Sequence, residues 1–351
     1  MPRSRRKRSR ELYPVERSPL AQRLTQRDLA VLLGTTVGDL HREIWYKEPA
    51  IVRRQQLTGR GKKVKLRKLA YPQHGTSLHL MHQRLARLLW RIELPPYVYS
   101  PRQGRTIRDN AAFHAGQRER RQLDLKAFYP STTTEMIRQR LMETFGMHRD
   151  VANLIARLVT IDGQAAFGST VTPVLMIVLY RDMFDRIDLA CRARGLRFSL
   201  WVDDMTISGR TVGLDLLEEV RAIVRDYGHR THKITYTGYR DRGCTTGVWN
   251  ERKTLMPSHE HEKRLRIALA DMRNAEAGTP IADNLDRAAM TALSAAGTIR
   301  HIAGPSSIQG RRMADLMETI RRTRRRAVGS SDLTGVVKSV RLSDDGDDIP
   351  F

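Results

Sequence analysis

Apolar and polar side chains alternate along residues 198–209, which read FSLWVDDMTISG. This alternation has the period of a β-strand with one buried face. Two adjacent carboxylates, Asp203 and Asp204, interrupt it before apolar residues resume at Met205. The pattern therefore predicts a β-hairpin with both aspartates at its tip. An exposed acidic turn is the alternative interpretation, because Asp is common in turns.

A second strand is predicted over residues 121–128, RQLDLKAF. Leu123 and Leu125 fall on one face of this strand and Asp124 on the other. Pro130 cannot continue the strand, so Asp124 lies near the end of a strand that leads into a helix.

Apolar residues at helical spacing predict most of the remaining chain to be helical. The predicted helices cover residues 25–44 (two short helices around a Gly-Thr-Thr break), 78–92, 136–145, 151–161, 174–187, 214–227, 262–274, 284–299 and 307–327. Thr132 and Glu135 predict a capping box for the helix that ends at Gly146. The pair over 25–44 is typical either of a helix-turn-helix or of a plain helical hairpin packed on the main domain.

Shorter elements complete the pattern. Residues 59–72, GRGKKVKLRKLAYP, predict a basic hairpin that is either a solvated edge or a phosphate-contacting surface. Residues 167–173, FGSTVTP, predict a Gly-Ser-Thr turn that opens a helix, where hydroxyl and N–H groups serve as caps or hold an anion. Short strands are expected at 232–235 and 243–248.

The charge narrows the choice of partner. Among 351 residues, 62 Lys and Arg stand against 38 Asp and Glu, a formal charge of +24. This excess favours a polyanionic partner such as nucleic acid. No apolar run approaches the roughly 18 residues of a membrane span. Cys191 and Cys244 give neither a disulfide framework nor zinc spacing, so a reduced cytoplasmic setting is expected.

The two predicted strands together suggest a chemistry. If they are neighbours in a sheet, Asp124, Asp203 and Asp204 converge on one point. Such a cluster suits hard divalent cations, which prefer oxygen ligands. Two Mg²⁺ ions held there activate an attacking hydroxyl and stabilise a leaving oxygen in phosphoryl transfer. This reasoning predicts metal-dependent chemistry on nucleic acid, without separating a polymerase from a nuclease.

Four motifs in order resemble those of reverse transcriptases. They are DLKAFYPS (124–131), GSTVTP (168–173, similar to Gln-Gly-x-x-x-Ser-Pro), WVDD (201–204, similar to Tyr-x-Asp-Asp) and the Lys-containing HKIT (232–235). The resemblance implies an α+β right-hand polymerase with fingers, a palm of antiparallel sheet plus helices, and a helical thumb. The expected divisions are a basic arm and helical extension (1–58), fingers (59–115), palm (116–258), thumb (259–330) and a mobile acidic tail (331–351).

Two further elements resemble bacterial retron reverse transcriptases, namely NAAFH (110–114) and TTG (245–247). This implies an RNA-directed DNA polymerase that copies part of a cognate structured RNA from an RNA 2′-hydroxyl. The product is a branched RNA–DNA hybrid (msDNA), within an antiphage system that has a separate effector. The alternatives are an intron-type or non-retron defence enzyme, or a non-catalytic RNA-binding protein on a polymerase scaffold.

The resemblance also assigns roles to individual residues. Asp124, Asp203 and Asp204 are expected to bind two Mg²⁺ ions, with Mn²⁺ as a substitute. The nucleotide-binding residues implied are Arg67, Tyr129 (as steric gate against ribose), Gly168 and Lys233. The RNA-binding residues implied are Asn110, His114, Thr245, Thr246, Gly247, Arg321, Arg322, Arg324, Arg325 and Arg326.

Four positions depart from the family pattern. Trp201 replaces Tyr or Phe, Thr172 replaces Ser, and Thr245 replaces Val. Phe167 replaces Gln, and its apolar ring cannot make the hydrogen bonds of an amide. That last change is compatible with altered fidelity, with slower turnover or with membership of an unusual subfamily.

Overall fold

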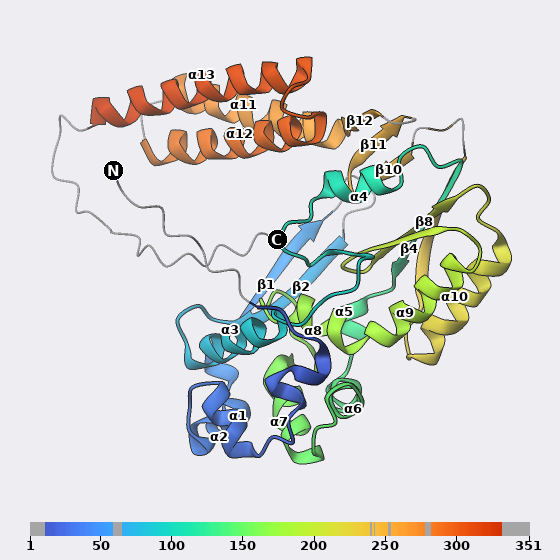
Figure 1. Cartoon of the computed structure of the whole chain (residues 1–351). Helices are drawn as coiled ribbons and strands as arrows, with labels where there is room; N and C mark the ends of the chain where they lie inside the picture. The colour runs from blue at the N-terminus through green and yellow to red at the C-terminus, as the bar shows by residue number, and fades with distance from the viewer. Residues whose placement is uncertain are drawn as a thin grey trace. The chain divides into compact units, whose positions relative to one another are not determined.

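The structure, a computed structural model, describes residues 11–58, 65–238, 241, 243–251, 254–277 and 282–331. Residues 1–10 of the predicted basic arm and residues 332–351 of the acidic tail lie outside the described residues. The chain forms two compact units (Figure 1). The first comprises Met1–Arg102, Gln122–Met205 and Gly213–Thr235, and the second Gln103–Arg121, Thr206–Val212 and Tyr236–Phe351. Among the described residues, no helix combines the length and apolarity of a membrane span.

A five-stranded sheet contains both predicted strands. Its order is β3 (Val98–Ser100), β7 (Arg197–Trp201), β8 (Asp204–Gly209), β4 (Glu119–Leu125) and β9 (Thr231–Thr237). The predicted hairpin is confirmed, because β7 and β8 are neighbours in the sheet and only residues 202 and 203 separate them. The strands that carry Asp124 and Asp204 are neighbours, as convergence of the carboxylates required. At the sheet edge, β3 pairs with β7 in parallel, where an antiparallel sheet was expected.

The hairpin strands are buried on both faces, so the expectation of one buried face is wrong. Ser199, Thr206 and Ser208 are as buried as the apolar residues between them. Serine and threonine count as polar in the sequence pattern, but their side chains are small enough to be buried under a packed helix. On β7 that helix is α9 (Arg181–Arg192), which packs on the strand in the first unit.

Eight further helices belong to the first unit and follow the predicted pattern with local differences. They are α1 (Gln26–Leu32), α2 (Val37–Trp45), α3 (Ser77–Leu89), α5 (Phe128–Ser131), α6 (Thr134–Phe145), α7 (Arg149–Val159), α8 (Thr172–Leu179) and α10 (Leu214–Asp226). Short 3₁₀ turns lie at Val15–Arg17, Pro19–Ala21 and Glu48–Ala50. Helices α1 and α2 pack on α7, so this pair is at least a packed helical hairpin.

Two local expectations about helices are corrected. The single helix predicted over 174–187 is broken at Tyr180, where α8 ends and α9 begins. The capping box is wrong: Thr133 caps α6 by accepting from the Met136 N–H, while the Thr132 hydroxyl donates to the Phe128 carbonyl over 2.7 Å.

The basic hairpin begins earlier than predicted. Strand β1 (Ile51–Thr58) pairs antiparallel with β2 (Lys65–Pro72), so its first strand precedes the Gly-rich segment. Residues 59–64 lie outside the described residues. A smaller hairpin, β5 (Thr160–Ile161) with β6 (Gln164–Ala165), follows α7.

The second unit is built around a three-helix bundle, α11 (His259–Ala277), α12 (Ala282–Ala303) and α13 (Ile308–Ser331). Helix α12 packs on both neighbours (Figure 1). It buries small residues, Ala289, Ala292 and Ala296, which allow close helix contact. The same unit holds α4 (Ile107–Phe113) and a sheet of β10 (Gly243–Thr245), β11 (Val248–Glu251) and β12 (Thr254–Pro257).

Candidate active site

Three carboxylates come together at the end of the central sheet. Asp124 is the last residue but one of β4, Asp203 lies in the hairpin turn, and Asp204 begins β8. One carboxylate oxygen from each lies within 4.8 Å of the others. The Leu125 N–H donates to the Asp203 carbonyl over 3.1 Å, which ties β4 to the turn. Val202 adopts φ +59°, a left-handed conformation that is rare for a β-branched residue and marks a constrained turn.

The negative charges of the three carboxylates in this cluster repel one another. Burial, followed by the charges of Asp204 and Asp124, raises the pKa of Asp203 to about 7. Crowding by protein atoms and the charge of Asp124 raise the pKa of Asp204 to about 6, although Asp204 keeps solvent-exposed surface. The Asp203 and Asp204 carboxylates are thus costly to ionise, and a bound cation relieves that cost. An all-oxygen donor set of this kind fits a hard divalent metal.

Two basic residues on β9 face Asp124. Lys233 donates from Nζ to Asp124 Oδ2 over 2.7 Å, and His232 Nε2 lies 3.4 Å from the same oxygen. Lys233 takes a left-handed backbone conformation with φ +53°. The structure therefore brings Lys233, expected from the sequence, directly to the carboxylate cluster.

The loop before α8 joins two other expected nucleotide residues. The Phe167 ring lies 5.5 Å from the Tyr129 ring, centre to centre, at 63°. The Arg67 guanidinium lies 6.0 Å from the centre of the Phe167 ring. Burial and the charge of Asp203 raise the pKa of Tyr129, so its phenol stays protonated beside the cluster. Phe167 is a site residue that the sequence presented only as a departure from a motif.

Gly168 is required by its surroundings. Its φ is +107°, and a Cβ added there would lie 2.7 Å from the Tyr71 ring. No other residue fits without moving Tyr71. The Ala70 N–H donates to the Phe167 carbonyl over 2.9 Å, so β2 is bonded to the loop as well as packed on it.

A buried histidine, His82, is hydrogen-bonded to the loop before α8. His82 on α3 donates from Nε2 to the Leu158 carbonyl over 2.9 Å. Its Nδ1 therefore accepts from the Ser169 hydroxyl, 2.6 Å away. Burial lowers the pKa of His82 to about 4, which keeps the ring neutral and this pairing intact. No sequence pattern pointed to His82, because a histidine on an apolar helix face is usually structural.

The expected retron-specific residues lie in the second unit, and three of them are buried. Asn110, His114 and Thr245 have no exposed surface. His114 Nδ1 is 2.6 Å from the Ser208 hydroxyl. These three side chains are buried in the structure, and the RNA-binding role expected for them stays a prediction. Asn110 finds no hydrogen-bond partner for its amide among the described residues.

Thr246 and Gly247 form the two-residue turn between β10 and β11. Their φ values are +48° and +79°, the pattern of a type I′ hairpin turn. Both residues are partly exposed. Of the TTG triplet, this turn is the part that a partner can touch.

The basic run of α13 divides into two kinds of arginine. Arg321, Arg322 and Arg325 are at least half exposed and share a single counter-ion, Glu318. Arg324 instead bonds Asp286 of α12 over 2.5 Å and links two helices of the bundle. The Arg326 side chain lies outside the described residues.

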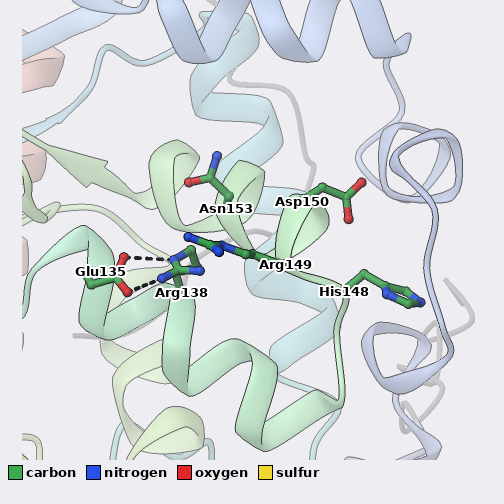
Figure 2. A pocket seen from close by; sticks show the side chains of 6 residues that line it. All are labelled: Glu135, Arg138, His148, Arg149, Asp150 and Asn153. Atoms are coloured by element: carbon green, nitrogen blue, oxygen red, sulfur yellow. Dashed lines mark hydrogen bonds and ion pairs between the residues drawn. The ribbon is translucent and has the colours of Figure 1, made fainter.

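An open hollow of about 630 Å³ on α6 and α7 contains none of the expected residues. It is lined by Glu135, Arg138, His148, Arg149, Asp150 and Asn153 (Figure 2). Figure 2 shows Glu135 and Arg138 paired on one side of it. Asp150 accepts from the Gln26 amide over 2.9 Å. Both acidic residues are thus satisfied, and the carboxylate cluster remains the better candidate for chemistry.

Comparison with known proteins gives two curated relatives. The chain is 28% identical to the retron Mx65 reverse transcriptase of Myxococcus xanthus over 295 residues, covering 76% of this chain and 68% of that protein. It is 26% identical to the retron Se72 reverse transcriptase of Salmonella heidelberg over 118 residues, covering 34% of this chain and 31% of that protein. No family model matches.

Among solved structures, a foamy viral protease–reverse transcriptase in complex with double-stranded DNA aligns with a TM-score of 0.42 and 13% identity. The alignment covers 83% of this chain and 47% of that chain.

Proposed function

We propose, from the premise that the chain is a bacterial retron-type reverse transcriptase, that it copies a cognate structured RNA into DNA. The single observation that carries the catalytic part is the cluster of Asp124, Asp203 and Asp204 within 4.8 Å. Carboxylates from β4, from β8 and from the turn between β7 and β8 support metal-dependent phosphoryl transfer at this point.

The three aspartates would hold two Mg²⁺ ions, with Mn²⁺ as a substitute. Such ions, when bound, polarise the phosphoryl group and stabilise the attacking and leaving oxygens. The elevated pKa values of Asp203 and Asp204 support this assignment, because the cluster gains most from a cation that replaces protons. The all-carboxylate donor set favours Mg²⁺ over softer metals.

The surrounding side chains position the nucleotide. Arg67, which lies beside Phe167, and Lys233, which is paired with Asp124, would contact its phosphates. Tyr129 would act as the steric gate that excludes a ribose 2′-hydroxyl. Gly168 would let the backbone approach the substrate, and its lack of a side chain also accommodates the Tyr71 ring packed against it.

The partners proposed are the structured RNA, its DNA product, deoxynucleotides and a separate effector protein, within a cytoplasmic antiphage system. The net charge of +24 supports the nucleic-acid partners. Priming from an RNA 2′-hydroxyl would give a branched msDNA. The Thr246–Gly247 turn and the exposed arginines of α13 are the surfaces proposed to contact RNA and duplex backbone.

Primer extension with the purified chain tests the catalytic proposal. We expect Mg²⁺-dependent DNA synthesis on an RNA template, and its loss in Asp203→Ala. Asp226→Ala, which removes an exposed carboxylate paired with Arg186, should keep full synthesis. Full synthesis by Asp203→Ala would overturn the site. Absence of synthesis by the wild-type chain, with RNA still bound, would favour the non-catalytic alternative.

Nucleic acid from cells that express the native locus tests the priming proposal. A short DNA linked to RNA and sensitive to debranching enzyme is the expected result. DNA without an RNA branch would overturn priming from a 2′-hydroxyl and favour another class of bacterial reverse transcriptase.

A further inference from the structure

Phe167 occupies a central place among the residues proposed to bind the nucleotide. Its ring contacts the Tyr129 ring at 5.5 Å on one side, and the Arg67 guanidinium lies 6.0 Å away on another. An amide at this position would offer a donor and an acceptor. The phenyl ring offers neither, so its contribution is shape and packing.

The loop that carries Phe167 is held from several directions. The Ala70 N–H donates to the Phe167 carbonyl over 2.9 Å, and the Ala166 N–H donates to the Val159 carbonyl over 3.0 Å. Ser169 is bonded to the fully buried His82. A ring mounted on a segment that is hydrogen-bonded at residues 166, 167 and 169 is a rigid support.

Tyr129 depends on neighbouring rings for its orientation. It lies on α5, a helix of one turn, and its ring stacks on Phe128 at 5.8 Å and meets the edge of Phe167. Phe128 is buried, whereas Phe167 is partly exposed beside the carboxylates. An aromatic pair of this geometry contributes about 0.5–1.5 kcal/mol beyond its buried area. Such a contact biases the ring between rotamers by roughly 2- to 10-fold.

We propose that Phe167 determines sugar specificity by holding the Tyr129 ring in its gating position. The site then rejects a ribose 2′-hydroxyl by shape, with two aromatic rings as its wall. This inference rests on the proposed polymerase function and names a further specificity residue of the same site. Phe167 acts through Tyr129 and is therefore a positioning residue.

Single-nucleotide incorporation opposite a fixed template base tests the inference. The measured quantity is the ratio of kcat/KM for dGTP to that for GTP, in wild type, Phe167→Leu, Tyr129→Ala and the double variant. We expect Phe167→Leu to lower the ratio about 3- to 10-fold, and Tyr129→Ala to lower it further. The double variant should match Tyr129→Ala alone, because Phe167 has no effect without the ring it supports.

Two additional variants serve as a control for the loss of a ring and as a substitute for Phe167→Leu. Phe145→Leu removes the same ring atoms from the core of α6 and should leave the ratio unchanged. Phe167→Met, of similar volume, replaces Phe167→Leu if that variant fails to fold, and should also lower the ratio. An unchanged ratio in both Phe167 variants would overturn the inference, as would an equal further decrease in the Tyr129→Ala background. Absence of DNA synthesis by the wild type would instead overturn the proposed function.

Discussion

Lys233 and Asp124 form the closest charged contact of the carboxylate cluster, with Nζ 2.7 Å from Oδ2. Lys233 therefore neutralises the same carboxylate that a metal ion would bind. The Lys233 side chain is 60% exposed, so the pair is worth only about 0.2–1 kcal/mol. The contact is consequently weak enough to exchange when a cation or a nucleotide phosphate arrives.

We expect Lys233→Met to separate metal binding from turnover. The Mg²⁺ concentration for half-maximal activity should fall about 2- to 5-fold, because Asp124 loses its competing cation. The kcat should fall roughly 100-fold, because the ammonium group proposed to contact the nucleotide phosphates beside Asp124 is removed. Steady-state Mg²⁺ titrations measure both values, with Lys263→Met on α11 as the control. An increased Mg²⁺ requirement would contradict this competition.

The pKa values of the cluster predict an unusual pH dependence of stability. Asp203 is raised to about 7, so the folded state keeps a proton that the unfolded chain releases near pH 4. Stability without metal therefore falls as pH rises from about 4 through about 7. Asp203→Asn removes this loss and should melt at a higher temperature than wild type at pH 8, with a smaller difference at pH 5.

Thermal melts in EDTA at the two pH values measure this effect. Adding Mg²⁺ at pH 8 should raise the melting temperature of wild type more than that of Asp203→Asn, because binding to the folded state stabilises it. Parallel pH profiles for the two proteins would show that Asp203 titrates as an ordinary surface carboxylate.

The lowered pKa of His82 predicts a pH dependence of stability opposite in sign to that of Asp203. The pKa of His82 is lowered to about 4, so the unfolded chain binds a proton below about pH 6.5 that the folded state refuses. Stability is lost as pH falls from 6.5 to 4, by about 3 kcal/mol for this one group. His82→Gln retains a donor for the Leu158 carbonyl and an acceptor for Ser169 without titrating.

Urea unfolding at pH 7 and pH 5 tests the role of His82. The free energy of unfolding of His82→Gln should decrease less between these two pH values than that of wild type. His259→Gln, at a histidine with an 87% exposed side chain, should behave as wild type. A wild-type pH slope in His82→Gln would mean that His82 is protonated in the fold.

The parts of the site that were predictable from sequence are those with a strand period. The two apolar–polar alternations located Asp124 on a strand and Asp203 and Asp204 at a hairpin tip, and the adjacency of the two strands β4 and β8 is confirmed. The burial of Asn110 and His114 was not predictable, because the residues around them form the same sequence pattern whether these side chains face a partner or lie in the interior. The helix break at Tyr180 was also not predictable, because apolar residues at helical spacing occur both before and after it. The ring contacts of Phe167 arise from residues 38 positions apart, which no local pattern encodes.

The arginines of α13 give a matched pair for the final prediction. Arg322 is 70% exposed, whereas Arg324 is held by Asp286 of the neighbouring helix. If α13 contacts duplex backbone, Arg322→Ala should reduce the slope of log affinity against log salt by about 0.9 and leave the melting temperature unchanged. Arg324→Ala should lower bundle stability by about 0.5–1 kcal/mol, because it removes a half-exposed ion pair between α12 and α13. Fluorescence anisotropy of an RNA–DNA duplex between 50 and 200 mM salt measures the slopes, and equal slopes for wild type and Arg322→Ala would remove Arg322 from the proposed duplex contact.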